Sequence, residues 1–290
     1  MPSLRNLLHR PNHHPSPSPA SASHTLRGAS YSRNWTRASA EASGNGESGS
    51  PNTLQSYFES HTEGRGIWKW NNYFEIYTRH LAKFVGREVH CLEIGVYSGG
   101  SLDMWKHYFG PGCVVYGVDV QPACQIYEDE RTRISIGDQA DRTFWKDFKE
   151  HYPVIDILID DGSHKPEHQI TTLEEMLPHL GPGGVYLCED IHGNPHGFSS
   201  YIHGLAASLN AWVPNSRNPH GKLASSPTPF QAAIHSVHIY PYAAVIEKNS
   251  RPLAELVAPK HGTEWQPFLD PSTTTSTTPA ARTQGTTQKL

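Results

Sequence analysis

The sequence has no long apolar run, no paired cysteine motif and no strong excess of one charge. No apolar stretch approaches the ~20 residues that a membrane-spanning helix needs, so we expect no membrane partner. The formal net charge is -4, which gives no sign of the basic face that binds nucleic acid. The four cysteines show no C-x-x-C spacing, and we interpret them as reduced structural thiols of a cytoplasmic protein.

Hydrophobic residues make up only 36% of the chain, so part of it is expected to lie outside any core. Residues 1–52 are rich in Ser, Pro, His and Gly, and residues 262–290 in Thr, Pro, Ser and Gln. We predict that both are disordered tails around one domain at 53–261. The first tail has arginines but no acid before Glu41, so mitochondrial targeting is the alternative to a plain tail.

Short apolar runs alternate with helical patterns along the predicted domain. Strands are predicted at 88–94, 114–118, 133–136, 154–160 and 183–188, and helices at 70–84, 102–109, from 141 and 166–180. This alternation indicates an α/β fold, with a mostly parallel sheet and helices on both faces. Residues 235–240 and 243–248 alternate like a C-terminal antiparallel hairpin.

Acidic residues follow two of these runs directly. Asp160 and Asp161 end one strand, and Glu189 and Asp190 end the next. The carboxyl ends of parallel strands meet at one rim, where open α/β sheets bind ligands. Asp161, Glu189 and Asp190 offer oxygen ligands alone, which suit Mg²⁺, Mn²⁺ or Ca²⁺. The alternative is that these acids cap helices or bond to loop N–H groups.

His164 lies three residues after Asp161, just before a predicted helix. An imidazole titrates near neutral pH and can act as a general base. The alternative is an ordinary surface histidine in a chain with 19 histidines. Its position beside the acids favours the catalytic role.

A glycine-rich turn, Glu93-x-Gly95-x-x-x-Gly99-Gly100-Ser101, joins the first predicted strand to a helix. Such a turn lets a ligand approach the backbone and the free N–H groups of the helix. It is not G-x-G-x-x-G, so the fingerprint of a nicotinamide dinucleotide is missing. Asp119 ends the second strand, where an acid can bind two ribose hydroxyls.

The glycine loop resembles motif I of class I S-adenosylmethionine-dependent methyltransferases. Further matching motifs are Gly117-Val118-Asp119, Gly137-Asp138-Gln139, Asp160-Asp161-Gly162-Ser163-His164 and Glu189-Asp190. Together they resemble the Mg²⁺-dependent sugar O-methyltransferases of antibiotic biosynthesis, and they are similar to cephalosporin hydroxylase-like proteins. The resemblance implies a Rossmann-like class I methyltransferase fold.

The resemblance also implies a cofactor, a metal and an acceptor. Residues implied to bind S-adenosylmethionine are Glu93, Gly95, Gly99, Ser101, Asp119, Asp138, Gln139 and Asp160. The Gly95 loop would face the methionine part, Asp119 the ribose, and Asp138 with Gln139 the adenine. Mg²⁺ or Mn²⁺ would be held by Asp161, Glu189 and Asp190. A small-molecule acceptor would chelate it through neighbouring hydroxyls, and His164 would take the proton.

Two other functions stay open at this point. One is an accessory protein that binds S-adenosylmethionine without catalysis. The other is an NAD-dependent oxidoreductase, which Asp119 fits but the glycine loop does not. The acceptor and the metal are not determined by the sequence, and a homo-oligomer is compatible with it.

Overall fold

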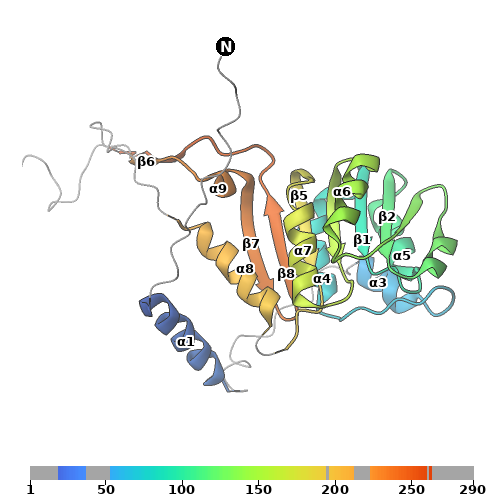
Figure 1. Ribbon diagram of the computed structural model, residues 1–290, viewed down its shortest axis with the longest axis horizontal. Helices are drawn as coiled ribbons and strands as arrows, with labels where there is room; N and C mark the ends of the chain where they lie inside the picture. The colour runs from blue at the N-terminus through green and yellow to red at the C-terminus, as the bar shows by residue number, and fades with distance from the viewer. Residues whose placement is uncertain (1–18, 37–52, 194–195, 212–222, 260, 263–290) are drawn as a thin grey trace, which may run out of the picture. The chain divides into compact units, whose positions relative to one another are not determined.

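The computed structural model describes residues 19–36, 53–193, 196–211, 223–259 and 261–262 (Figure 1). The chain divides into two compact units, Met1–Pro51 and Asn52–Leu290. The second unit contains the sheet and every element of the candidate site. No helix in the described part of the chain is both long enough and apolar enough to cross a membrane.

Seven strands form one sheet in the order β3-β2-β1-β4-β5-β8-β7. They are β1 (Val89–Ile94), β2 (Cys113–Asp119), β3 (Thr132–Ile136), β4 (Ile155–Asp160), β5 (Leu180–Cys188), β7 (Ile234–Tyr240) and β8 (Ala243–Lys248). The first five strands pair in parallel, and β8 runs antiparallel to both β5 and β7. The predicted α/β sheet and C-terminal hairpin are therefore confirmed.

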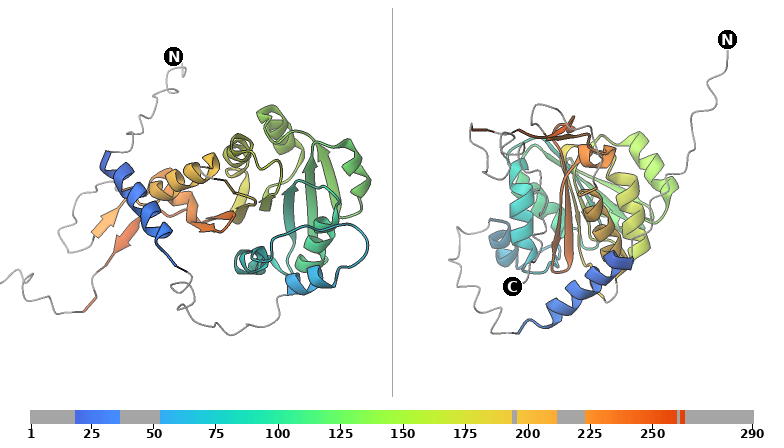
Figure 2. Two further views of the ribbon diagram at one scale, coloured as in Figure 1. Left: turned by 90° about the horizontal axis from the view of Figure 1, so that it is seen from below. Right: turned by 90° about the vertical axis from the view of Figure 1, so that its left-hand side faces the viewer.

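Helices cover both faces of this sheet (Figures 1 and 2). One face carries α3 (Thr53–Ser60), α4 (Tyr73–Leu81) and α5 (Gly100–Phe109), and the other carries α6 (Arg142–His151), α7 (Pro166–Met176) and α8 (Gly197–Ser208). The chain order reverses between β1 and β4, which are neighbours in the sheet. Such a reversal opens a crevice at the carboxyl ends of the strands, where α/β proteins bind ligands.

The apolar runs of the strands are unbroken because both faces are buried. In β4, Ile157 and Ile159 pack into the core on the α3–α5 side, while Leu158 packs on the α6–α8 side. All three are fully buried. Burial of each such side chain contributes about 1.5–3 kcal/mol, so the sheet is a stable base for the loops at its rim.

One segment of the predicted tails differs from the sequence prediction. Residues Pro19–Arg33 form α1 inside the tail predicted to be disordered, so that prediction is wrong for this segment. Alanines, Leu26 and Arg27 favour helix there, and Pro19 suits the first turn. None of the described side chains at 22–36 is buried, so α1 adds nothing to a core. Residues 1–18, 37–52 and 263–290 of the predicted tails lie outside the described residues.

Smaller differences concern element ends. The helix predicted over 166–180 ends at Met176. The strand predicted to begin at 183 begins at Leu180 instead, so the helix must end before it. Before the hairpin, β6 (Leu223–Ser225) pairs with β9 (Leu256–Ala258) in a second, antiparallel sheet that the sequence prediction did not include. A short helix, α9 (Pro229–Ala233), leads into β7. The cytoplasmic location and the oligomeric state stay predictions from the sequence.

Candidate metal and cofactor site

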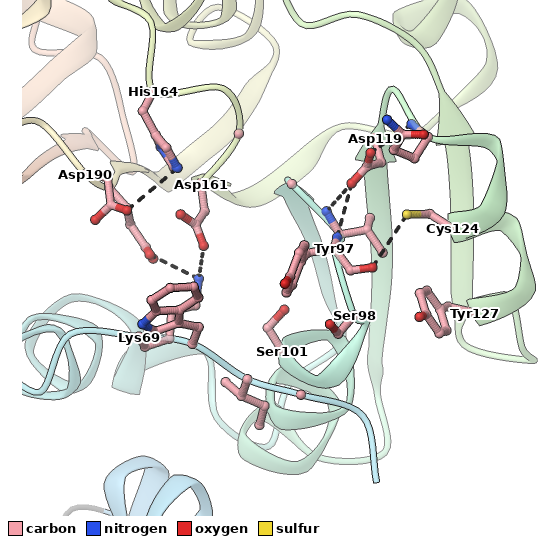
Figure 3. Close-up of a pocket in the computed structure, with 18 of the residues that line it drawn as sticks. Lys69, Tyr97, Ser98, Ser101, Asp119, Cys124, Tyr127, Asp161, His164 and Asp190 are labelled. Atoms are coloured by element: carbon pink, nitrogen blue, oxygen red, sulfur yellow. Dashed lines mark hydrogen bonds and ion pairs between the residues drawn. The ribbon is translucent and has the colours of Figure 1, made fainter.

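A cavity of about 810 Å³ opens at the carboxyl ends of the central strands (Figure 3). Its wall includes the glycine loop after β1, the loop after β4, the acids after β5 and the segment 66–70. A second cavity of about 280 Å³ adjoins it, since both are lined by Gly95, Asp119 and Gly162. The two cavities form a cleft across the point where the strand order reverses.

The glycine loop touches the loop after β4. Gly95 has a φ of +89°, and a Cβ there would lie 2.0 Å from the carbonyl oxygen of Asp161. Gly99 has a φ of +73° and directly precedes α5. Glycine adopts such φ angles without strain, so the backbone conformation of this turn explains why the motif has glycine at these two positions.

Asp119 holds the glycine loop at the end of β2. Its Oδ2 accepts the N–H groups of Val96 at 2.9 Å and Tyr97 at 3.1 Å, and its Oδ1 accepts that of Gln121 at 2.9 Å. Asp119 lines both cavities. It is therefore at the place expected for a ribose-binding acid, and it also fixes the loop beside it.

Asp161, His164 and Asp190 meet at the other end of the large cavity (Figure 3). One ligand atom from each lies within 4.8 Å of the others. The Nε2 of His164 is 3.7 Å from Oδ2 of Asp190. The Nδ1 of His164 is buried without a hydrogen-bond partner among the described residues, which is unusual for a buried polar atom.

His164 and Asp190 both have left-handed backbones, with φ angles of 58° and 54°. A non-glycine residue in that region costs on the order of 1–3 kcal/mol and persists only where its surroundings hold it. Asp190 is held by Trp70 Nε1 at 2.9 Å and the Tyr73 hydroxyl at 2.8 Å, which both donate to its Oδ1. The strain is thus located at the two residues that face each other across the cluster.

Lys69 is a site residue that the sequence analysis missed. Its side chain is only 2% exposed, and its Nζ lies 2.6 Å from Asp161, 3.0 Å from Glu189 and 3.4 Å from Glu93. Asp161 and Glu189 are 92 and 120 residues away from Lys69 along the chain, and Glu93 lies in β1. No local sequence pattern therefore indicates that Lys69 belongs to the site. One buried ammonium therefore faces three carboxylates.

Glu189 is the most buried of the predicted metal ligands, at 1% exposure. Its Oε1 accepts the hydroxyl of Tyr77 at 2.6 Å, and its Oε2 faces Lys69. Burial raises the pKa of Glu189 to about 8, against the lowering effect of Lys69. Burial likewise raises the pKa of Glu93, again against Lys69. A raised pKa favours the protonated carboxyl, so this cluster takes up a proton where no further cation balances its charge.

Glu93 and Asp160 are fully buried and line neither cavity. Glu93 accepts the hydroxyl of Ser101 at 2.7 Å, and Ser101 itself lines the large cavity. Asp160 accepts the Gln139 amide at 3.0 Å and the Tyr186 hydroxyl at 3.1 Å. Burial raises the pKa of Asp160 to about 6. Both acids were predicted to bind the cofactor; their hydrogen bonds go to Ser101, Gln139 and Tyr186, and their role toward a cofactor stays a prediction.

Gln139 and Asp138 lie in the small cavity. Gln139 is 4% exposed, and its Oε1 accepts the N–H of Ser163 at 2.7 Å, so it supports the loop after β4. Asp138 is exposed, and its Oδ1 accepts the N–H of Ala140 at 2.9 Å. Of the predicted adenine-binding pair, Asp138 is the one whose side chain is accessible.

Comparison with known proteins agrees with this geometry. Residues 92–191 match the family model of a methyltransferase domain. The central part of this chain is a methyltransferase domain. It includes the glycine loop, Asp119 and the acids after β4 and β5, so the Rossmann-like methyltransferase fold predicted from the sequence is confirmed.

The methyltransferase domain has relatives that are named sugar or macrolide O-methyltransferases. The 8-demethyl-8-alpha-L-rhamnosyl tetracenomycin-C 2'-O-methyltransferase of Streptomyces olivaceus is 32% identical over 210 residues, which is 64% of this chain and 53% of that protein. The demethylmacrocin O-methyltransferase of Streptomyces fradiae is 39% identical over 122 residues, covering 40% of this chain and 30% of that protein. The chain thus spans about half or less of these relatives.

Among solved structures, the MycE methyltransferase of mycinamycin biosynthesis, in complex with Mg and SAH, superposes with a TM-score of 0.55. The sequences are 28% identical, and the match covers 68% of this chain and 53% of MycE. A further MycE structure, with Mg, SAH and mycinamycin VI, matches with a TM-score of 0.54. These relatives share the fold and part of the sequence of the methyltransferase domain.

Proposed function

We propose that this protein is an S-adenosylmethionine-dependent O-methyltransferase assisted by a divalent metal. Its acceptor would be a small, sugar-like molecule with neighbouring hydroxyls. The observation that carries this proposal is that two of the proposed metal ligands, Asp161 and Asp190, lie within 4.8 Å of each other and of the proposed base His164, on the wall of the cavity that the glycine loop also lines. The MycE complexes with Mg and SAH support it, because they hold both groups on the same fold.

The cleft fits a nucleoside-type cofactor. Its larger cavity measures about 810 Å³, within the range of about 300–1,000 Å³ typical of small-molecule sites. The methionine part would lie against Gly95 and Ser101, the ribose at Asp119 and the adenine near Asp138. Glu93, Gln139 and Asp160 would act through the residues that they hold.

The acidic cluster fits a divalent cation. Asp161, Glu189 and Asp190 supply carboxylate oxygens, the donors that Mg²⁺ and Mn²⁺ prefer. Lys69 alone does not neutralise Glu93, Asp161 and Glu189, so a further positive charge is favourable there. A bound metal would lower the pKa of a chelating acceptor hydroxyl.

His164 is the group that would take the acceptor proton. Its Nε2 faces the cavity beside Oδ2 of Asp190, which would stabilise the imidazolium that forms. Trp70 and Tyr73 fix Asp190 through its other oxygen. The acceptor oxygen would then attack the methyl group of the sulfonium in line, and much of the acceleration would come from positioning.

The test is methyl transfer from labelled S-adenosylmethionine to a panel of glycosides with neighbouring hydroxyls, with Mg²⁺ or with EDTA. Asp161→Ala and His164→Ala should each lower the transfer rate by roughly 100-fold or more. Both should bind S-adenosylhomocysteine with nearly unchanged affinity, measured by calorimetry. His179→Ala, in the turn between α7 and β5, is the matched control and should leave the rate unchanged. Transfer that persists in both site variants would contradict the proposal.

The accessory, non-catalytic role is the second candidate. The observation in its favour is that Lys69 already pairs Asp161 and Glu189. S-adenosylhomocysteine binding without any response to Mg²⁺ and without a methyl acceptor would favour this role. The NAD-dependent oxidoreductase is not supported, since the cleft belongs to a methyltransferase domain.

A further inference from the structure

A second group of metal-binding side chains lies away from the cleft. His80 comes from the last turn of α4, His238 from β7 and Glu247 from β8. One ligand atom from each lies within 4.8 Å of the others. None of the three lines the cofactor cavities. Three separate elements therefore bring two imidazoles and a carboxylate to one place.

His80 is the buried centre of this group, with a side chain only 2% exposed. Its Nδ1 lies 2.5 Å from Oε1 of Glu247, and its Nε2 lies 2.8 Å from the hydroxyl of Tyr240. Tyr240 therefore holds one ring nitrogen and directs the other toward the carboxylate. Metal-binding histidines are commonly oriented in this way, by a hydrogen bond to the nitrogen that does not bind the metal.

The other two side chains are oriented in the same manner. The Nε2 of His238 lies 2.9 Å from the hydroxyl of Ser236, and its ring centroid is 4.5 Å from that of His80. The second oxygen of Glu247 accepts from Lys83 at 2.7 Å. Each member of the group is thus fixed by a polar neighbour outside it.

We propose that His80, His238 and Glu247 form a second metal site that binds a transition-metal ion such as Zn²⁺. Two nitrogens and one oxygen select such an ion over Mg²⁺, which prefers oxygen alone. Ligand atoms at about 2.0–2.1 Å around Zn²⁺ in a tetrahedron lie roughly 3.3 Å apart, which side-chain rotation reaches from the present separations. Water would complete the coordination.

Such a site would tie α4 to the hairpin of β7 and β8. The same helix carries Tyr73 and Tyr77, whose hydroxyls bind Asp190 and Glu189 in the cleft. Tyr73 is seven residues from His80, about 10 Å along the helix. The ion would therefore stabilise the helix that positions the acids, without touching the reacting groups.

The test uses the full chain, freed of metal by chelator and titrated with Co²⁺, whose visible absorption rises when it binds in a tetrahedral site with nitrogen ligands. His238→Ala should weaken Co²⁺ binding, followed by this absorption, by more than about tenfold. Losing a side chain that merely hydrogen-bonds a metal ligand already costs about 10–100-fold in metal affinity. His235→Ala is the matched control, because His235 is exposed on the same strand and also lies beside Ser236. It should leave the titration unchanged.

Two further variants keep the outcome clear. Glu247→Gln preserves the shape of the side chain, so it tests the site even if His238→Ala folds poorly. Asp161→Ala should retain the Co²⁺ absorption, which separates this site from the proposed magnesium site. Zn²⁺ should also raise the melting temperature of the wild type but not of Glu247→Gln. Equal titrations of the wild type, His238→Ala and Glu247→Gln would overturn the proposal and leave a purely hydrogen-bonded cluster.

Discussion

Replacing Lys69 by methionine removes the ammonium that faces Glu93, Asp161 and Glu189 while nearly keeping the length of the side chain. The three N–O distances of 3.4, 2.6 and 3.0 Å make this a buried ion cluster. Breaking a buried pair by removing one partner costs about 3–5 kcal/mol. We expect the metal-free variant to lose about that much unfolding free energy.

The same variant should bind Mg²⁺ more tightly. Lys69 and the metal compete for Asp161 and Glu189, and two unit charges about 4 Å apart interact by about 4 kcal/mol at an effective dielectric constant near 20. Proton uptake by Glu93 and Glu189 offsets part of this gain, because burial already raises the pKa of both. An affinity gain of at least about tenfold, or about 1.4 kcal/mol, remains as the expected result.

The assay combines urea unfolding with calorimetric titration of Mg²⁺ in the wild type and in Lys69→Met. Lys106→Met is the matched control, because Lys106 is also largely buried and pairs with Asp103 at 2.9 Å, far from the acids of the cleft. The control should lose stability without any gain in Mg²⁺ affinity. If Lys69→Met binds Mg²⁺ no better than the wild type, Lys69 and the metal do not share these carboxylates.

Three further changes have defined outcomes. Gly95→Ala should weaken S-adenosylhomocysteine binding by about tenfold and destabilise the fold by about 1–3 kcal/mol, because the added Cβ would lie 2.0 Å from the carbonyl oxygen of Asp161. An affinity equal to that of the wild type would refute this close approach. Tyr77→Phe should lose about 1.5–3 kcal/mol in urea unfolding, because it removes a hydrogen bond to Glu189. Glu247→Gln should lose about 1 kcal/mol above pH 4.5 in metal-free protein, after discounting for solvent screening. The folded pKa of Glu247 is lowered to about 2, so this difference should vanish as the pH falls through that value.

The strands and their two-sided burial could be predicted from local patterns. A run such as Ile157-Leu158-Ile159 has no polar position, so it can only be buried on both faces, and the structure places it in the middle of the sheet. Acids at the ends of such runs must lie at the rim. This is why Asp161 and Asp190 could be predicted to lie together beside His164, whereas Glu189, the third predicted metal ligand, is not part of that group and pairs with Lys69 and Tyr77.

The helix at Pro19–Arg33 could not be recognised by the same reasoning. Its sequence has no apolar period, and burial is what makes a period necessary. The early start of β5 was missed for a related reason. Leu180 pairs with Ile155, and a register shift follows before Val185 pairs with Ile157. The glycines of β5 between Leu180 and Val185 carry no side chain that would show a strand pattern.

The sequence by itself determined the fold class, the glycine turn and the acids at the rim, because each depends on neighbours within a few residues and on the geometry of parallel strands. Only the tertiary structure decided which partners those acids have. Lys69 reaches Glu189 across 120 residues, and His80 reaches Glu247 across 167. The physical reason is that such contacts depend on how the helices and loops pack on the sheet, and side chains distant in sequence leave no local signal of that packing.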